Sequence, residues 1–188
     1  MNSKTKTMVG IGLFTAIVVV LQLLGGGIKF TFFSITLVLV PIVVGSAVYS
    51  WKAGAWLGFA FGLTVLLTGD AAAFLAIDFW ATVFVVLLKG VLCGFVAGIV
   101  YALLQKLSDT LAVVTAAVIC PIVNTSVFVF GCYVFFFDGI AEWAAEKGYT
   151  DVGTYIIVVL VGINFLIELG VNIVLAPIIT RLIHIGKR

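Results

Sequence analysis

The sequence predicts an all-α integral membrane protein, a bundle of six transmembrane helices with both termini in the cytoplasm. Of its 188 residues, 64% are hydrophobic and only 10% are charged, whereas a soluble domain is about 45–50% apolar and about 25% charged. The apolar runs are long and continuous, and a helix needs about 20 such residues to cross the roughly 30 Å hydrocarbon core. The runs do not alternate with polar residues, which excludes an outer-membrane barrel.

Six apolar runs give the expected spans. They cover residues 8–24, 35–49, 53–67, 80–104, 111–137 and 154–179. The first run follows Lys4 and Lys6 but has no small-x-small cleavage site, so we expect a span rather than a removable signal. The glycines at 25–27 end it, and Pro121 is expected to break the fifth span. Helix capping is the simplest role for Asp70, Asp78, Ser108 and Thr154.

The basic residues orient the bundle. With a cytoplasmic N-terminus and six spans, seven of them fall inside: Lys4, Lys6, Lys52, Lys106, Arg181, Lys187 and Arg188. Only Lys29 and Lys147 fall outside, and an excess of lysine and arginine marks cytoplasmic loops. No linker or low-complexity tract divides the chain, so we expect residues 1–188 to form a single domain.

Small residues form stripes along three spans. The third span has glycines at 54, 58 and 62, and the fourth has them at 90, 94 and 98. Because these positions are four residues apart, each set lies along one helix face, where glycine lets membrane helices approach closely. The stripes serve either packing within this bundle or docking of another membrane subunit. A weaker stripe, Gly12 and Ala16, lies in the first span.

Polar side chains inside a span are costly in lipid and are therefore functional candidates. Lys89 of the fourth span and Asn164 of the sixth lie at similar depth, about 12–15 Å from the outer ends of their helices. Lys89 either pairs with Glu168, extends to the interface, or binds a ligand's carboxylate or carbonyl. Asn124 and Asn164 either hydrogen-bond between helices or bind the ligand.

Aromatic side chains gather next to the outer loops. Phe30 and Phe32 lie in the first outer loop, after the glycines at 25–27, and Trp80 follows the second. An interfacial aromatic belt explains such residues. Alternatively, the first loop is a mobile lid on a glycine hinge, and the rings form the wall of a ligand pocket.

Several stretches together carry a family resemblance: residues 12–16, 33–70, 87–106 and 164–183. Six spans within 188 residues, a glycine-bearing first loop and no nucleotide-binding motif complete the pattern. With these features the chain resembles the S components of energy-coupling-factor (ECF) transporters. The resemblance covers nearly the whole chain.

The resemblance implies a subunit of the cell membrane that binds one water-soluble vitamin with high affinity from outside. Such a subunit docks on a membrane T component driven by two ATPase subunits, so ATP is used by the partners, and no cofactor or catalytic residue is expected in this chain. In the family an AxxxA-like pattern on the first helix meets the T component, and Gly12 and Ala16 match it in size. The family's site lies in the outer half and implies these ligand contacts: Lys89, Asn124, Asn164, Glu168, Trp80, Phe30 and Phe32.

The substrate is less well defined. Lys89 suits an anionic vitamin, which favours pantothenate narrowly, although folate or riboflavin would use the aromatic residues better. An intramembrane enzyme is a competing class, but the single histidine, His184, lies in the basic tail, and no aspartate pair lies within a span. A second alternative is a self-sufficient gradient-driven carrier with Glu168 as its proton site, which would work without ATPase partners.

Overall fold

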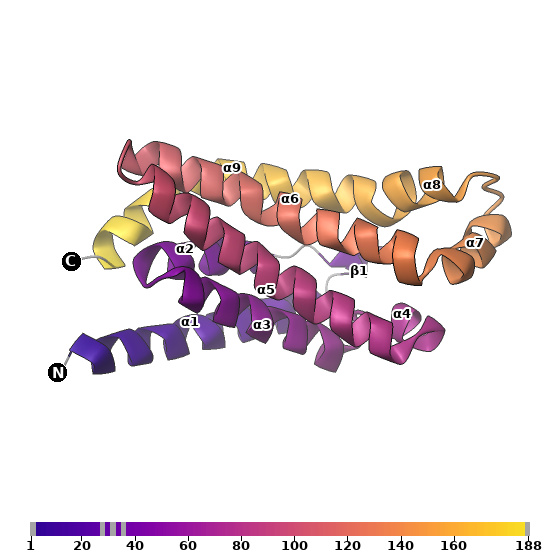
Figure 1. The fold of residues 1–188 in the computed structure, drawn as a ribbon, viewed down its shortest axis with the longest axis horizontal. Helices are drawn as coiled ribbons and strands as arrows, with labels where there is room; N and C mark the ends of the chain where they lie inside the picture. The colour runs from indigo at the N-terminus through magenta and orange to yellow at the C-terminus, as the bar shows by residue number, and fades with distance from the viewer. Residues whose placement is uncertain (1–2, 27–28, 31–32, 35–36, 187–188) are drawn as a thin grey trace.

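The computed structural model describes residues 3–26, 29–30, 33–34 and 37–186. It is a long bundle of helices with both termini at one end (Figure 1). The elements in order are α1 (Ser3–Gly26), β1 (Lys29–Phe30), β2 (Phe33–Ser34), α2 (Leu39–Val48), α3 (Trp51–Thr68), α4 (Ala72–Ile77), α5 (Phe79–Leu104), α6 (Asp109–Phe135), α7 (Phe137–Glu146), α8 (Val152–Thr154), the π-helix η1 (Tyr155–Gly162) and α9 (Ile163–Gly186). β1 and β2 form one short antiparallel pair. The all-α class predicted from the sequence is therefore confirmed.

Five helical segments are long and apolar enough to cross a membrane. They are α1, α3, α5, α6 and the continuous run of α8, η1 and α9. α2 has only ten residues, about 15 Å of helix, whereas the hydrocarbon core is about 30 Å thick. Eight of the ten are buried, so the predicted second span is represented by a short core helix. Among the described residues the structure thus has five such segments, not the six predicted.

α1 and α3 nevertheless run in the same direction along the bundle. Trp56 Nε1 donates to Thr15 Oγ1 at 3.1 Å, and Gln22 Nε2 donates to Asp70 Oδ2 at 2.7 Å. Contacts therefore advance in the same direction along both helices, so α1 and α3 are parallel. α2 runs the opposite way, since Tyr49 at its end lies against Gly10 of α1 and Gly45 lies near Phe14. Six passes, and a cytoplasmic location for the termini, stay predictions.

A seam of glycines joins α3 to α5. Gly58 and Gly90 lie backbone against backbone, and Gly54 has the same kind of contact. A Cβ added at Gly62 would lie 2.8 Å from the backbone oxygen of Val86, closer than real Cβ atoms approach. Backbones pack this tightly only where no side chain intervenes. The stripes therefore serve packing within this bundle, and the docking alternative for them is wrong.

Side-chain caps define the starts of several helices. Asp78 Oδ1 accepts from the Ala81 amide at 2.8 Å and caps α5. Ser108 caps α6, and both caps agree with the sequence prediction. At the last span the cap is Asp151 rather than Thr154, because Asp151 Oδ2 accepts from the Thr154 amide at 2.6 Å. Hydrogen bonds with Thr154 hold the pKa of the Asp151 carboxyl below its ordinary value.

The fifth span and two loops differ from expectation. α6 continues through Pro121 from Asp109 to Phe135, so the expected break is wrong; a proline is tolerated in a membrane helix when its surroundings satisfy the freed carbonyl. The loop expected at 68–79 contains α4. The polar stretch at 138–153 contains most of α7, which buries Ile140 and Ala144. Both short helices lie at the end remote from the termini (Figure 1).

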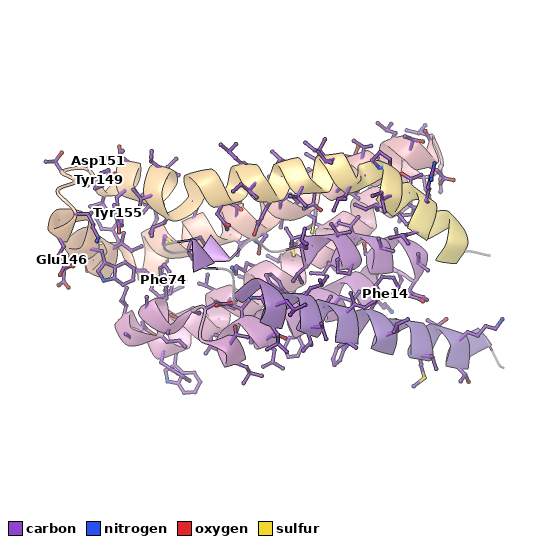
Figure 2. All side chains as sticks on the ribbon, turned by 180° about the vertical axis from the view of Figure 1, so that it is seen from behind. Phe14, Phe74, Glu146, Tyr149, Asp151 and Tyr155 are labelled. Carbon is purple, nitrogen blue, oxygen red and sulfur yellow. The ribbon has the colours of Figure 1, made fainter. Side chains whose placement is uncertain are left out.

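Two buried clusters make up the core. One surrounds α2 and includes Val18 and Ile42. The other lies toward α7 and includes Phe136 and Ile140. Figure 2 shows the end that α7 occupies through its labelled side chains: Phe74, Glu146, Tyr149, Asp151 and Tyr155. Residues of both clusters line the same cavity.

Candidate ligand-binding site

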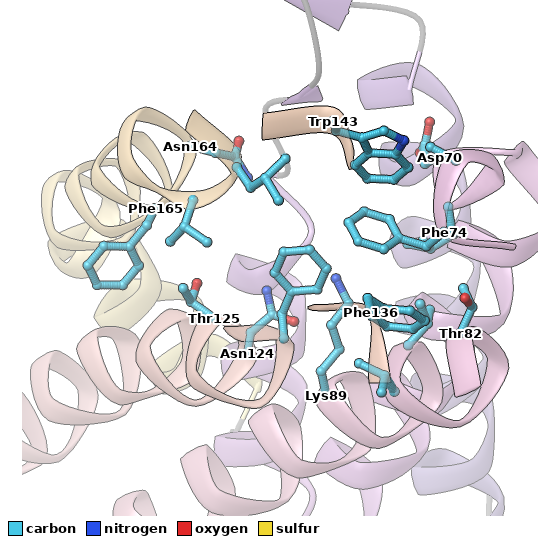
Figure 3. Close-up of a pocket in the computed structure, with 18 of the residues that line it drawn as sticks. Asp70, Phe74, Thr82, Lys89, Asn124, Thr125, Phe136, Trp143, Asn164 and Phe165 are labelled. Atoms are coloured by element: carbon cyan, nitrogen blue, oxygen red, sulfur yellow. The ribbon is translucent and has the colours of Figure 1, made fainter. Parts of the chain in front are cut away.

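A cavity of about 660 Å³ lies in the half of the bundle remote from the termini. Its wall takes residues from α1, α3, α4, α5, α6, α7, η1 and α9, so elements far apart in the sequence converge on it (Figure 3). Small-molecule sites enclose about 300–1,000 Å³. The cavity is therefore large enough for a small organic ligand.

Lys89 extends from α5 into this cavity (Figure 3). Its Nζ lies 5.3 Å from the centre of the Phe128 ring and 5.9 Å from that of Phe61. Glu168 and Asp70 are the carboxylates whose charges act on it, and the rings of Phe128 and Phe61 are its described contacts. Aromatic faces attract a cation weakly, so the ammonium can still accept a stronger, anionic partner.

An aromatic wall stands beside the cation. Phe74 of α4 meets three rings edge-on, with centroids 5.3 Å from Phe128, 5.2 Å from Phe136 and 5.4 Å from Trp143. These rings come from α6, α7 and the residue between them. Edge-to-face aromatic pairs fix ring orientation and add to the energy of burial. The arrangement presents flat, apolar surfaces beside Lys89.

Amide and carboxyl groups line the opposite side. Asn124 of α6 is 6% exposed, and its Oδ1 has no hydrogen-bond partner among the described residues. Asn164 and Glu168, one turn apart on α9, line the same cavity. Farther along α9, Asn172 Nδ2 donates to the Glu168 backbone oxygen at 2.8 Å. The cavity thus combines a cation, amides and an acid.

Asp70 belongs to a hydrogen-bond network at the cavity wall. Its Oδ2 accepts from Gln22 Nε2 at 2.7 Å and from Thr68 Oγ1 at 3.1 Å. α4 starts at Ala72 without a side-chain cap, so the capping role predicted for Asp70 is wrong. The network ties α1 to the turn that follows α3.

Four of the predicted ligand contacts meet in this cavity: Lys89, Asn124, Asn164 and Glu168. Trp80 does not line it; its side chain is 78% exposed and pairs with Phe79. The start of α5 turns this ring outward, as suits an interfacial aromatic residue. Phe30 lies in β1, where only the backbone is described, and Phe32 lies outside the described residues.

The predicted docking pair lies on the outer face of α1. Gly12 and Ala16 are both exposed, and nothing lies within 4 Å of a Cβ added at Gly12. Unlike the glycines of α3 and α5, Gly12 has no neighbour among the described residues to explain its small size. Its role as a docking face stays a prediction.

Several lining residues escaped the sequence reasoning. Gln22 is a polar side chain within an apolar span, so the rule that singled out Lys89 would have found it. Phe74 and Phe128 give no comparable signal, because phenylalanine is ordinary in apolar runs. Trp143 is different: it is one of the aromatic residues near the outer loops that the sequence offers for a pocket wall, and it lines the cavity.

The fold and the cavity define a class: a helical membrane protein with an internal cavity large enough for a small molecule. The family then follows from the sequence match. A family model described as ECF transporter, substrate-specific component, matches residues 6–180, and the chain belongs to this family. Searches of the curated proteins and of the solved structures found no match.

Family membership fixes the general function. The protein is a substrate-specific component of an ECF transporter, which is a membrane transport subunit and not a member of an enzyme family. The S-component resemblance is thereby confirmed, and the intramembrane-enzyme alternative is set aside. Components of this kind bind small substrates and work with a T component and ATPases.

Proposed function

We propose that this protein captures a small water-soluble vitamin, with pantothenate first and then folate or riboflavin. The observation that carries the proposal is Lys89, whose ammonium projects into the cavity with aromatic faces as its direct contacts. A cation at membrane depth needs a counter-charge, and a ligand carboxylate supplies one. Pantothenate and folate carry such a carboxylate, and riboflavin does not.

The remaining lining residues support a polar ligand with an apolar part. Asn124 and Asn164 offer amide groups for hydroxyl or amide groups of the ligand. The Phe74 and Trp143 rings offer apolar surface beside them. Pantothenate combines a carboxylate, hydroxyl groups and an amide with a branched apolar centre, so it matches both kinds of surface.

The proposed orientation places the cavity toward the outside of the cell membrane. The termini lie at the opposite end of the bundle (Figure 1), and the lysine and arginine distribution assigns that end to the cytoplasm. A substrate would then enter at the end where α4 and α7 lie. A reporter fused to the C-terminus should be active only inside the cell; activity outside would contradict this topology.

We further propose that the outer face of α1 docks on the membrane T component, and that two ATPase subunits drive transport. Gly12 and Ala16 would lie at the contact, since their small side chains let another helix approach closely. In this arrangement ATP is consumed by the partners, and this chain holds no cofactor. Gly12→Leu should reduce recovery of the T component with the tagged protein, while Gly170→Ala, also at a site with nothing within 4 Å, serves as the control.

The direct test is to purify the protein in mild detergent from cells grown in rich medium and to identify any co-purified small molecule by mass spectrometry. We expect a near-stoichiometric carboxylate vitamin, whose affinity falls in Lys89→Ala and Asn164→Ala. An empty protein that binds none of pantothenate, folate and riboflavin in a thermal-shift assay would contradict the proposal.

Glu168 supports a second candidate function, that of a gradient-driven carrier. Its carboxyl is 4% exposed and lines the cavity, which is where a gradient-driven carrier would hold its proton. Uptake into vesicles distinguishes the two mechanisms. We expect uptake only with the T component, the ATPases and ATP; uptake by this chain alone with a proton gradient would favour the carrier.

A further inference from the structure

Gln22 is a polar side chain that α1 sends into the interior. It is 1% exposed, although α1 leaves most of its large apolar side chains outside. Its Nε2 donates to Asp70 Oδ2 at 2.7 Å. A carboxylate only accepts, so this contact fixes which way the amide points. Hydrogen bonds to a charged group are roughly twice as strong as neutral ones.

Asp70 lies in the turn that leads from α3 into α4. Thr68 Oγ1 donates to the same carboxylate oxygen at 3.1 Å. Gly69 has a φ of +78°, which glycine adopts without strain, and its oxygen accepts from the Ala72 amide at 3.0 Å. None of the six residues of α4 is fully buried. Phe74, Leu75 and Ile77 are half-buried against the core, so the position of this short helix depends on the turn that precedes it as well as on their packing.

α4 places Phe74 on the cavity wall, where it meets Phe128, Phe136 and Trp143. We propose that Gln22 is a positioning residue for ligand binding: through Asp70 it fixes α4, and through α4 it sets Phe74 against the ligand. The proposal rests on the proposed function, because it takes this cavity to be the ligand site. It adds α1 to the elements that determine affinity.

The first test compares the loss of two hydrogen bonds made by α1. One joins Gln22 to Asp70, in the turn after α3, and the other joins Thr15 to Trp56 of α3. Gln22→Met keeps an unbranched side chain and removes the bond to Asp70. Thr15→Val removes the acceptor of Trp56 Nε1, which lies outside the cavity lining. For whichever of pantothenate, folate and riboflavin the wild-type protein binds, we expect Gln22→Met to weaken binding about tenfold. Thr15→Val should change the affinity by less than about twofold relative to the wild type.

A donor–acceptor exchange supplies the rescue. Gln22→Glu alone sets two carboxylates against each other and should weaken binding at least as much as Gln22→Met. Adding Asp70→Asn restores one donor and one acceptor and should recover most of the affinity. A double-mutant cycle of Gln22→Met with Phe74→Leu should be non-additive, since both changes act on the same contact. Additive losses would mean that Gln22 does not act through Phe74.

A ligand-free measurement keeps the inference separate from the proposed function. With Trp51, Trp56 and Trp80 replaced by phenylalanine, Trp143 is the single remaining tryptophan. Adding Gln22→Met should raise the acrylamide quenching of Trp143, because Phe74 no longer covers it in a fixed position. Unchanged quenching, or equal affinity losses in Gln22→Met and Thr15→Val, would overturn the inference. If the wild-type protein binds none of the three vitamins, the proposed function fails and quenching alone decides the role of Gln22.

Discussion

Replacing Lys89 with methionine removes the cation and keeps an unbranched side chain beside the Phe128 ring. A hydrogen bond to a charged group contributes about 1.5–3 kcal/mol, and a tenfold change in affinity corresponds to about 1.4 kcal/mol. We therefore expect Lys89→Met to weaken binding of a carboxylate vitamin by about tenfold to a hundredfold. Isothermal titration calorimetry of the protein in nanodiscs would measure the dissociation constant.

An uncharged ligand tests whether the carboxylate is the group that Lys89 binds. Pantothenol replaces the carboxylate of pantothenate with an alcohol, and a diester neutralises folate. We expect the wild-type protein to bind the uncharged analogue more weakly, and Lys89→Met to change that affinity by less than about threefold. Equal losses for the charged and uncharged ligands would refute the reasoning, because the lost interaction would then not involve the carboxylate.

The competing hypothesis is that Lys89 pairs with Glu168, and it predicts a different result. Removing one member of a buried ion pair leaves an uncompensated charge and destabilises the protein. In that case Lys89→Met would lower the melting temperature of the ligand-free protein, and adding Glu168→Gln would restore it. We expect instead that the melting temperature of Lys89→Met stays close to that of the wild type and that the loss is in affinity.

Three further predictions concern the seam, the aromatic wall and the last span. Gly58→Leu should lower the melting temperature, because its side chain meets the backbone of α5 and overpacking costs about 1–3 kcal/mol; Gly12→Leu meets nothing within 4 Å and should not. Trp143→Ala should weaken ligand binding about tenfold in the same titration, since an aromatic pair contributes about 0.5–1.5 kcal/mol beyond its buried area; Trp143→Phe should retain most of it. The pKa of Asp151 is lowered in the folded protein, so its stabilising effect is present above the unfolded pKa of about 3.9 and is lost as the pH falls through the folded pKa. The melting-temperature difference between the wild type and Asp151→Ala should therefore be seen at pH 7 and shrink below about pH 4; a difference that grows with acidity would contradict the sign.

The long spans were predictable because each is an apolar run that ends at polar residues or glycine. α5 and α3 begin and end within two residues of the runs at 80–104 and 53–67. The run at 35–49 is just as apolar, but apolar composition does not distinguish a helix that faces lipid from one that faces protein. α2 faces protein on nearly all sides, with Ile42 and Val43 fully buried, so it was taken for a full-length span.

The polar half of the site was predictable, and the aromatic half only in part. Lys89, Asn124 and Glu168 stand out because a polar group within an apolar run is costly unless it has a function or a partner. Phe74 lies in a short helix that the sequence shows only as a loop, and its contacts depend on how α4 and α7 meet. Such contacts arise from tertiary packing, which one sequence does not encode in any local pattern.

Two kinds of contact hold the walls of the cavity. Lys89 precedes Gly90, whose backbone packs directly against Gly58, so the base of the cation cannot move unless two helices separate. α4 and α7 are joined by side-chain contacts, among them the Phe74–Trp143 pair, and separating such a pair costs only about 0.5–1.5 kcal/mol beyond the exposed area. The short helices are therefore the wall that moves at least cost. We expect a ligand to enter past them, while the cation that meets its carboxylate stays in place.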